Sequence, residues 1–344
     1  MEPGADAVPA REAHPAIFAN LKPEQIGSMS VPAVWWRWHM FIRLGYEIGI
    51  NCSQPTPMMT FLSVDRARRA DIVSELGPIS DPVVKMGEVT DPFGNVCMRM
   101  VVPAGGLRLS YDAVIKGSGR PDVVNRSAQA APVENLPPEC LPYLSASRYC
   151  ETDRFGALAW RLFGDVELGW ARVQAICDYV HQRLTFSYGY SATLRTAMEA
   201  HEERAGVCRD YAHLAVTLCR CMNIPARYVN GYMGDIGAAD NPAPMDFNAW
   251  FEVFLDDRWY TFDARHNVPR IGRIVVARGR DAADIPLIQT FGKHELTTFK
   301  VWTSKEADGV LTKPHSRADV SLLTPWFSER WSRLVQQREL ERKH

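Results

Sequence analysis

A cysteine stands immediately before a helical pattern in the stretch AGVCRDYAHLAVTLCRCMNIP, which begins at Ala205. Its apolar residues recur at spacings of three and four, as in a helix with one buried face. They are Val207, Tyr211, Leu214, Ala215, Leu218 and Met222. Asn223-Ile224-Pro225 ends the pattern. Cys208 is therefore expected in the first turn, where free backbone N–H groups and the helix dipole favour the reactive thiolate.

Further along the chain, DFNAWFEVFLDDRWYTFDARHN predicts two strands around a tight turn at Asp256-Asp257. A two-residue turn pairs Leu255 with Arg258 and sets Asn248 opposite Arg265. Asp263 is two residues from that partner, so the side chains of Asn248 and Asp263 are expected on one face of the hairpin. Cys208, Asn248 and Asp263 then follow the order of a nucleophile, base and orienting residue, with Asn in the middle position.

These segments resemble the transglutaminase-like superfamily, and specifically its bacterial two-domain, cysteine-peptidase-like branch. The resemblance runs from about residue 40 to about residue 302. The segments that carry it are Gln54 to Pro57, Asp91 to Asn95, Gly206 to Leu214, Ile224 to Val229, Ala249 to Val253, Trp259 to Asn267 and Arg273 to Asp284. It implies a papain-like α+β catalytic domain and a thioester mechanism acting on amides. The family pattern has His directly before Ala-Trp, where this chain has Asn248.

Cys208 is interpreted as the nucleophile rather than as a small buried core cysteine, and its backbone N–H as an oxyanion donor. Asp263 is interpreted as the orienting residue. The Asn248 amide can hydrogen-bond both but cannot carry a proton, and losing a general acid–base costs about 10²–10⁴-fold in rate. His266 is the alternative candidate base. Two aromatic residues, Trp250 and Tyr211, are assigned to the cleft, and His213 is read as structural.

Bulk composition limits the classes of partner. The 344 residues are 46 % hydrophobic and 23 % charged, with a formal net charge of -1. This balance favours neither nucleic acid nor an anionic membrane as a partner. Eight cysteines lack metal-ligand spacing, and the amino terminus lacks the apolar core of a secretory signal. We expect a cytoplasmic protein without metal or other cofactor.

The chain divides into five expected segments. Residues 1–38 are a Pro/Ala-rich leader, interpreted as a disordered tail or a docking segment. Residues 39–125 alternate apolar and polar positions between turn signals, which predicts a small β domain. A proline-containing linker is expected at 126–150 and the transglutaminase-like domain at 151–302. The tail at 303–344 has the pattern of one amphipathic helix.

The predicted fold class is α+β, with a small β domain before a papain-like, transglutaminase-like catalytic domain. Three functions stay open. The first is a cysteine-dependent acyl transferase, amidase or peptidase that forms a thioester at Cys208. The second is an inactive binding protein whose cleft holds a peptide or protein. The third is a biosynthetic acyl transferase that uses a carrier-bound thioester. The expected substrates are therefore peptides, proteins, small amides or thioesters.

Overall fold

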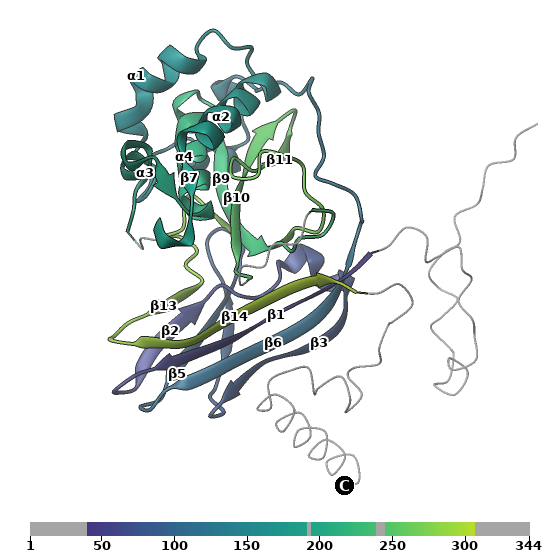
Figure 1. Cartoon of the computed structure of the whole chain (residues 1–344), viewed down its shortest axis with the longest axis vertical. Coiled ribbons are helices and arrows are strands. Elements are labelled where there is room, and N and C mark those ends of the chain that lie inside the picture. Colours follow the sequence, from purple (N-terminus) through teal and green to yellow (C-terminus); the bar gives the residue numbers. More distant parts are fainter. Residues whose placement is uncertain (1–39, 191–193, 239–244, 307–344) are drawn as a thin grey trace, which may run out of the picture. The chain divides into compact units, whose positions relative to one another are not determined.

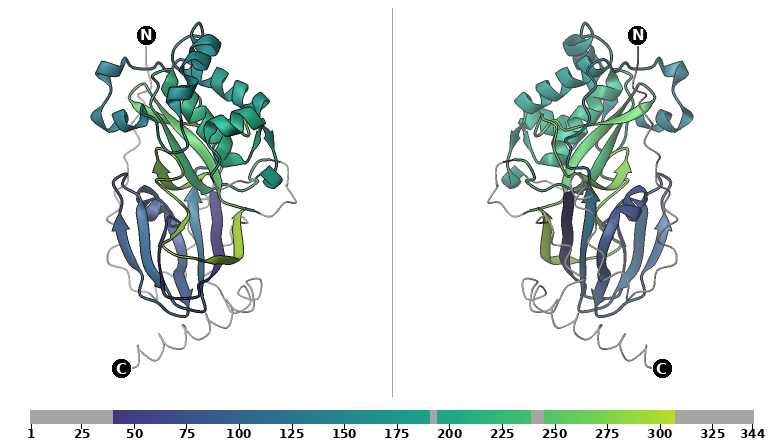
Figure 2. Two further views of the ribbon diagram at one scale, coloured as in Figure 1. Left: turned by 90° about the vertical axis from the view of Figure 1, so that its left-hand side faces the viewer. Right: turned by 90° about the vertical axis from the view of Figure 1, so that its right-hand side faces the viewer.

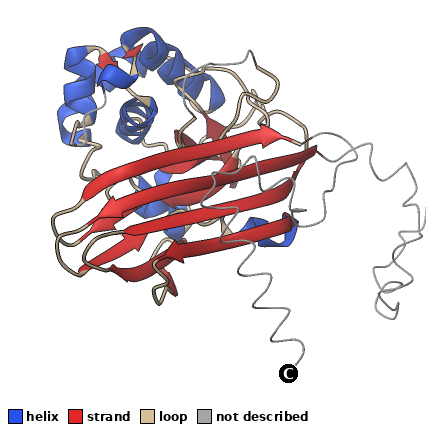
Figure 3. Ribbon diagram, turned by 60° about the horizontal axis from the view of Figure 1, so that its bottom comes forward, coloured by secondary structure: helices blue, strands red, loops and turns tan. Residues whose placement is uncertain are grey.

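The computed structural model describes residues 40–190, 194–238 and 245–306 of the chain. Its largest sheet is antiparallel with the strand order β14-β1-β6-β3. Figures 1 and 3 show these long strands running side by side. They span Glu295–Lys305 (β14), Met40–Asn51 (β1), Leu107–Gly117 (β6) and Ile72–Asp81 (β3).

A second antiparallel sheet has the order β13-β2-β5-β4. Its strands are Ile288–Thr290 (β13), Thr56–Thr60 (β2), Val96–Val102 (β5) and Gly87–Thr90 (β4). Alternating side chains from β1, β2, β5 and β6 bury one hydrophobic core together. The β-rich character predicted for this part of the chain is confirmed.

The third sheet has the order β11-β10-β9-β12 and is also antiparallel. It consists of Arg258–Phe262 (β11), Asn248–Leu255 (β10), Ala226–Tyr232 (β9) and Ile274–Gly279 (β12). The buried helix α4, Cys208–Cys221, packs against β9 and β10. Figure 2 shows the helices, in teal, gathered beside this sheet.

The other helices pack around α4. They are α1 (Thr152–Phe163), α2 (Trp170–Arg183) and α3 (Ala197–Glu203). Two short strands, β7 (Thr185–Phe186) and β8 (Ala205–Gly206), form a parallel pair just before α4. The remaining helical turns are η4 (Arg66–Asp71), η5 (Val133–Asn135), η6 (Pro138–Tyr143) and η7 (Tyr188–Tyr190). The predicted α+β class is confirmed.

The described strands do not follow the expected segment boundaries closely. Residues 288–302 lie within the expected catalytic segment, yet β13 pairs with β2 and β14 pairs with β1. Within the expected linker, Leu136 and Cys140 pack with Phe254 of β10. The leader 1–38 and all but the first four residues of the tail lie outside the described residues. None of the described helices combines the length and apolar character needed to cross a membrane.

Candidate active site

The start of α4 fixes the position of Cys208. Val207 is extended (φ −108°, ψ 178°), and Cys208 is the first helical residue, as predicted. The Val207 N–H donates to Asp210 Oδ2 at 2.9 Å, so a carboxylate of the first turn caps the helix. A Cβ on Gly206 would lie 2.6 Å from the Asp210 Cβ, and only glycine permits this approach.

Cys208 lines a cavity of about 570 Å³. Its apolar lining comes from the segment after β12, from β13 and from β14, and includes Ile285, Pro286, Leu287, Ile288 and Phe299. Polar residues also line it, namely Cys208, Arg209, Asp246 and Asn248. The structure thus brings Cys208 and Asn248 to one cavity, together with an apolar surface.

The Cys208 thiol is neutral at rest. Burial raises its pKa to about 11, although the Arg265 charge and a hydrogen bond from the Ala249 backbone N–H act in the opposite direction. The thiolate that the helix start is expected to favour is therefore opposed by the burial of the sulfur. Desolvation disfavours the charged form more strongly than the nearby positive groups favour it.

Asn248 is held by three hydrogen bonds. Its Nδ2 donates to the carbonyl oxygens of Asp246 at 3.2 Å and Met233 at 3.4 Å, and its Oδ1 accepts from Arg265 Nη1 at 3.0 Å. The predicted pairing of Leu255 with Arg258 is present, and continuing this register sets Asn248 opposite Arg265. The Arg265 guanidinium also lies 3.7 Å from the centre of the Phe186 ring. A permanent cation therefore stands beside Asn248 in the Cys208 site.

Asp263 has other partners. Its Oδ2 accepts from Arg273 Nη2 at 2.8 Å and is 2.9 Å from His266 Nδ1, while its Oδ1 accepts from the backbone N–H groups of Arg265 and His266. Burial raises the pKa of this carboxyl, but Arg273 and His266 together hold it well below its usual range. Among the described residues, none of its hydrogen bonds reaches Asn248. Asp263 lines a different cavity, of about 640 Å³, beside Trp170.

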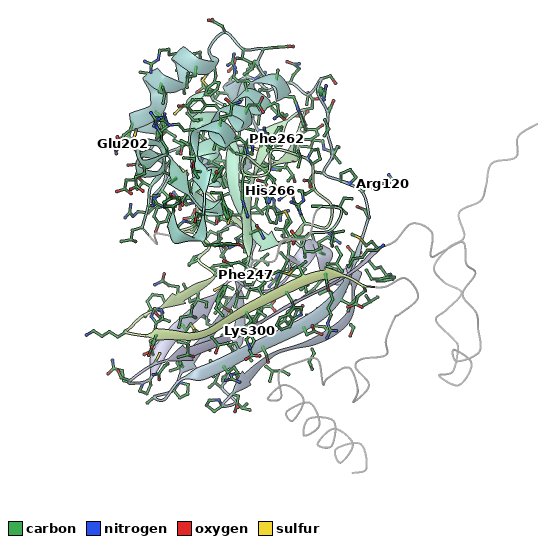
Figure 4. All side chains as sticks on the ribbon, in the orientation of Figure 1. Arg120, Glu202, Phe247, Phe262, His266 and Lys300 are labelled. Carbon is green, nitrogen blue, oxygen red and sulfur yellow. The ribbon has the colours of Figure 1, made fainter. Side chains whose placement is uncertain are left out.

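The remaining candidates lie away from the sulfur. His266 is bound to Asp263, is 22 % exposed and does not line the Cys208 cavity. Figure 4 labels His266, which follows β11, and Phe247, which precedes β10. Trp250 and Tyr211, assigned to the cleft, are both buried outside its lining. Tyr211 donates to the Leu184 carbonyl at 2.6 Å.

His213 is enclosed in the core beneath Tyr149, with 5.1 Å between ring centres. Its Nε2 accepts from the Ala282 N–H at 3.2 Å. Burial lowers its pKa well below the ordinary histidine value, so the ring is neutral. It therefore has a structural position. Within the described ranges, no group of three or more His, Cys, Asp or Glu side chains is arranged to hold a metal ion.

Sequence reasoning missed Asp246 as a member of the site. Its carboxyl lines the cavity, and its Oδ1 accepts the Phe247 N–H at 2.6 Å. Burial raises its pKa, and the Phe247 N–H and the Arg265 charge oppose that shift only in part. A sequence signal was available, because Asp246 precedes Asn248 by two residues and an extended chain repeats its side-chain direction at that interval.

Comparison with known proteins identifies the core of the chain. Residues 159–264 match the family model of the Transglutaminase-like superfamily. A crystal structure of a candidate cysteine protease from Cytophaga hutchinsonii has a TM-score of 0.69 and 29 % identity, over 78 % of this chain and 91 % of that chain. The chain thus carries a transglutaminase-like core of the kind found in a cysteine protease structure.

Two curated relatives are uncharacterized mycobacterial proteins. One, from Mycobacterium leprae, is 28 % identical over 116 residues, which cover 33 % of this chain and 41 % of the relative. The other, from Mycobacterium tuberculosis, is 33 % identical over 125 residues, which cover 32 % of this chain and 38 % of the relative. The match thus spans less than half the length of these relatives.

Proposed function

We propose that the protein is a cysteine-dependent acyl transferase or hydrolase in which Cys208 forms a thioester with the acyl group of its substrate. The observation that carries this proposal is the placing of Cys208. It is the first residue of a buried helix, and its sulfur lines a cavity while accepting the Ala249 N–H. A sulfur beside unpaired helix N–H groups can attack a carbonyl whose oxygen those N–H groups stabilise.

The apolar wall supports a donor with an apolar acyl part. Ile285, Leu287 and Phe299 line the same cavity as Cys208, so an acyl chain or an apolar peptide side chain would bury there against apolar side chains. Acyl donors of two classes fit this surface, amides and thioesters. Asn248 cannot donate a proton to a leaving group, which favours a thioester donor unless another residue supplies the proton.

A single acyl donor tests the proposal. The protein is incubated with S-phenyl thiobutyrate, and the butyryl group is located by peptide mass spectrometry. We expect a butyryl adduct on Cys208 that is absent from Cys208→Ala. Cys221→Ala is the matched control, because Cys221 is also a partly buried free thiol. If Cys208 stays unmodified while the protein is folded, the proposed function is wrong.

An inactive binding protein is the second candidate, and the neutral thiol supports it. A cysteine with a pKa of about 11 is almost entirely protonated at neutral pH. In that case, the cavity would bind an apolar peptide segment without forming an adduct. The same incubation separates the two functions, because binding without an acyl–Cys208 adduct would favour the second.

The free thiols of the chain are compatible with a reducing compartment, and specifically with the cytoplasm. All eight carry free thiols in the structure, and thiols of this number persist most readily where disulfides are kept reduced. We propose this location together with the enzymatic function, and fractionation of the native host cells tests it.

A further inference from the structure

Cleavage of an amide at the Cys208 site requires a residue that transfers protons. When an amide bond breaks, the departing nitrogen must gain a proton, and the thiol must lose one as the sulfur attacks. The Asn248 amide can do neither. His266 is bound to Asp263 and does not line the cavity. An amide donor therefore requires a further residue that carries a proton.

Asp246 fits this requirement by position. The described lining of the cavity contains one carboxyl group, that of Asp246; its other ionisable side chains are Cys208, Arg209 and two tyrosines. Phenol and guanidinium groups ordinarily keep their protons far above neutral pH, and burial raises the pKa of Tyr228 further still. Asp246 is thus the residue of this lining that can both accept and donate a proton.

The surroundings of Asp246 are suited to proton transfer. The Phe247 N–H, 2.6 Å from Oδ1, fixes the carboxyl at the entry to β10. Three other charged or titratable groups interact with it electrostatically: the Cys208 thiol from α4, Arg265 from the segment after β11, and Tyr188 from η7. Burial raises the pKa of the Asp246 carboxyl, and the Phe247 N–H and Arg265 oppose that rise in part.

We propose that Asp246 is the acid–base catalytic residue of the Cys208 site, an inference that rests on the proposed function. Its carboxylate accepts the thiol proton as the sulfur bonds to the acyl carbon. Its carboxyl then delivers that proton to the nitrogen as the carbon–nitrogen bond breaks. The acyl group moves from nitrogen to sulfur and the proton moves from sulfur to nitrogen. No further reactant is needed for acylation.

Two butyryl donors distinguish acid–base catalysis by Asp246 from nucleophilic attack by Cys208. Thiophenolate leaves S-phenyl thiobutyrate without a proton, whereas butyryl 4-nitroanilide must have its nitrogen protonated. Asp246→Asn keeps an oxygen acceptor for the Phe247 N–H but cannot carry a proton. We expect this variant to lose about 10²–10⁴-fold in acylation by the anilide and clearly less in acylation by the thioester, which needs Asp246 only to accept the thiol proton. Asp257→Asn is the control, because it removes an exposed carboxylate at the far end of the same hairpin.

The pH dependence gives a second measurement on the wild-type protein. Acylation by the anilide should rise as the pH rises through the pKa of Asp246, because the carboxylate is the form that accepts the thiol proton, and the Asp246→Asn variant should lack this rise. Equal losses on both donors, no loss on either, or a wild-type protein inert to the anilide overturns the role of Asp246. A wild-type protein that forms an adduct with neither donor overturns the proposed function as well.

Discussion

At the scale of single residues, the site combines a neutral nucleophile with a permanent cation. Arg265 lowers the pKa of the Cys208 thiol, although burial raises it more. The same guanidinium holds Asn248 Oδ1 at 3.0 Å. A histidine imidazolium at position 248 would both stabilise the Cys208 thiolate and transfer a proton. The Arg265 guanidinium stabilises the thiolate by its positive charge but cannot transfer a proton.

Replacing Arg265 with Met should raise the pKa of Cys208 further, because the favourable charge beside the thiolate is lost. Each pKa unit lowers the thiolate fraction at pH 8 about tenfold, and iodoacetamide reacts with the thiolate. The rate of Cys208 alkylation against pH measures the effect. Arg258→Met, on the same hairpin with its guanidinium over Tyr260, should leave that rate unchanged. An unaltered profile for Arg265→Met would mean that its charge does not reach the sulfur.

Asp263 should contribute to stability through Arg273. The carboxyl is 7 % exposed and bonds Arg273 Nη2 at 2.8 Å. Asp263→Asn should lower the free energy of unfolding by about 3 kcal/mol at pH 7, since it leaves a buried cation with one fewer partner. The folded pKa lies below the unfolded value of about 3.9. The contribution is therefore complete above the unfolded pKa, decreases as the pH falls below it, and is fully lost only below the folded pKa.

Urea unfolding of both proteins at pH 7 and near pH 3 measures this difference. The gap between the two stabilities should be smaller near pH 3 than at pH 7, because part of the contribution of the Asp263 charge is lost below the unfolded pKa. Asp257→Asn, which removes an exposed carboxylate, should track the wild type throughout. A constant gap between Asp263→Asn and the wild type at both pH values would show that the charge of Asp263 is not what stabilises the fold.

At the scale of elements, local patterns predicted the pieces that carry the site. The 3.6-residue period and the Asn223-Ile224-Pro225 stop predicted α4, which ends at Cys221. The two-residue turn predicted the register of β10 and β11. The partners of the charged side chains were not predictable in this way. Arg273 bonds Asp263 and also Asp122, 151 residues away, and no local period encodes a contact over that distance in sequence.

The β10–β11 turn itself gives a test of backbone strain. Asp256 and Asp257 have φ values of 45° and 57°, in the left-handed region that favours glycine. Asp257→Gly should stabilise the protein by up to about 1 kcal/mol, measured as a higher urea midpoint. Asp256→Gly relieves the same strain but loses the bond from the Gln129 N–H to Asp256 Oδ1, 3.0 Å long. It should therefore gain less, and equal gains would contradict the assigned role of that bond.

At the scale of the whole described fold, β10 belongs to two cores. Ala249, near its start, and Phe247, just before it, pack into the core shared with β1, β2 and β6. Phe251 and Val253, further along, pack into the core around α4. Two strands after the transglutaminase-like match return to the β-rich sheets, where β13 pairs with β2 and β14 pairs with β1. The two halves should therefore unfold in one transition rather than two.

A substitution at Gly45, in the largest sheet, tests whether the two cores unfold together. It lies in β1 between β6 and β14, and a Cβ there would overlap the Tyr111 carbonyl oxygen and the Trp302 ring. Gly45→Ala should cost about 3 kcal/mol, as overpacking of a tight site does. Gly87→Ala, where nothing lies within 4 Å of the added Cβ, is the matched control and should change little.

The readout is the urea dependence of thiol labelling, followed separately at Cys52 and Cys219. Cys52 is buried in the core of the β sheets, and Cys219 is fully buried in the core around α4. Because β10 joins both cores, Gly45→Ala should lower the labelling midpoint of Cys219 by as much as that of Cys52. If the midpoint of Cys219 stays at its wild-type value while that of Cys52 falls, the two cores unfold independently, and β10 does not couple them.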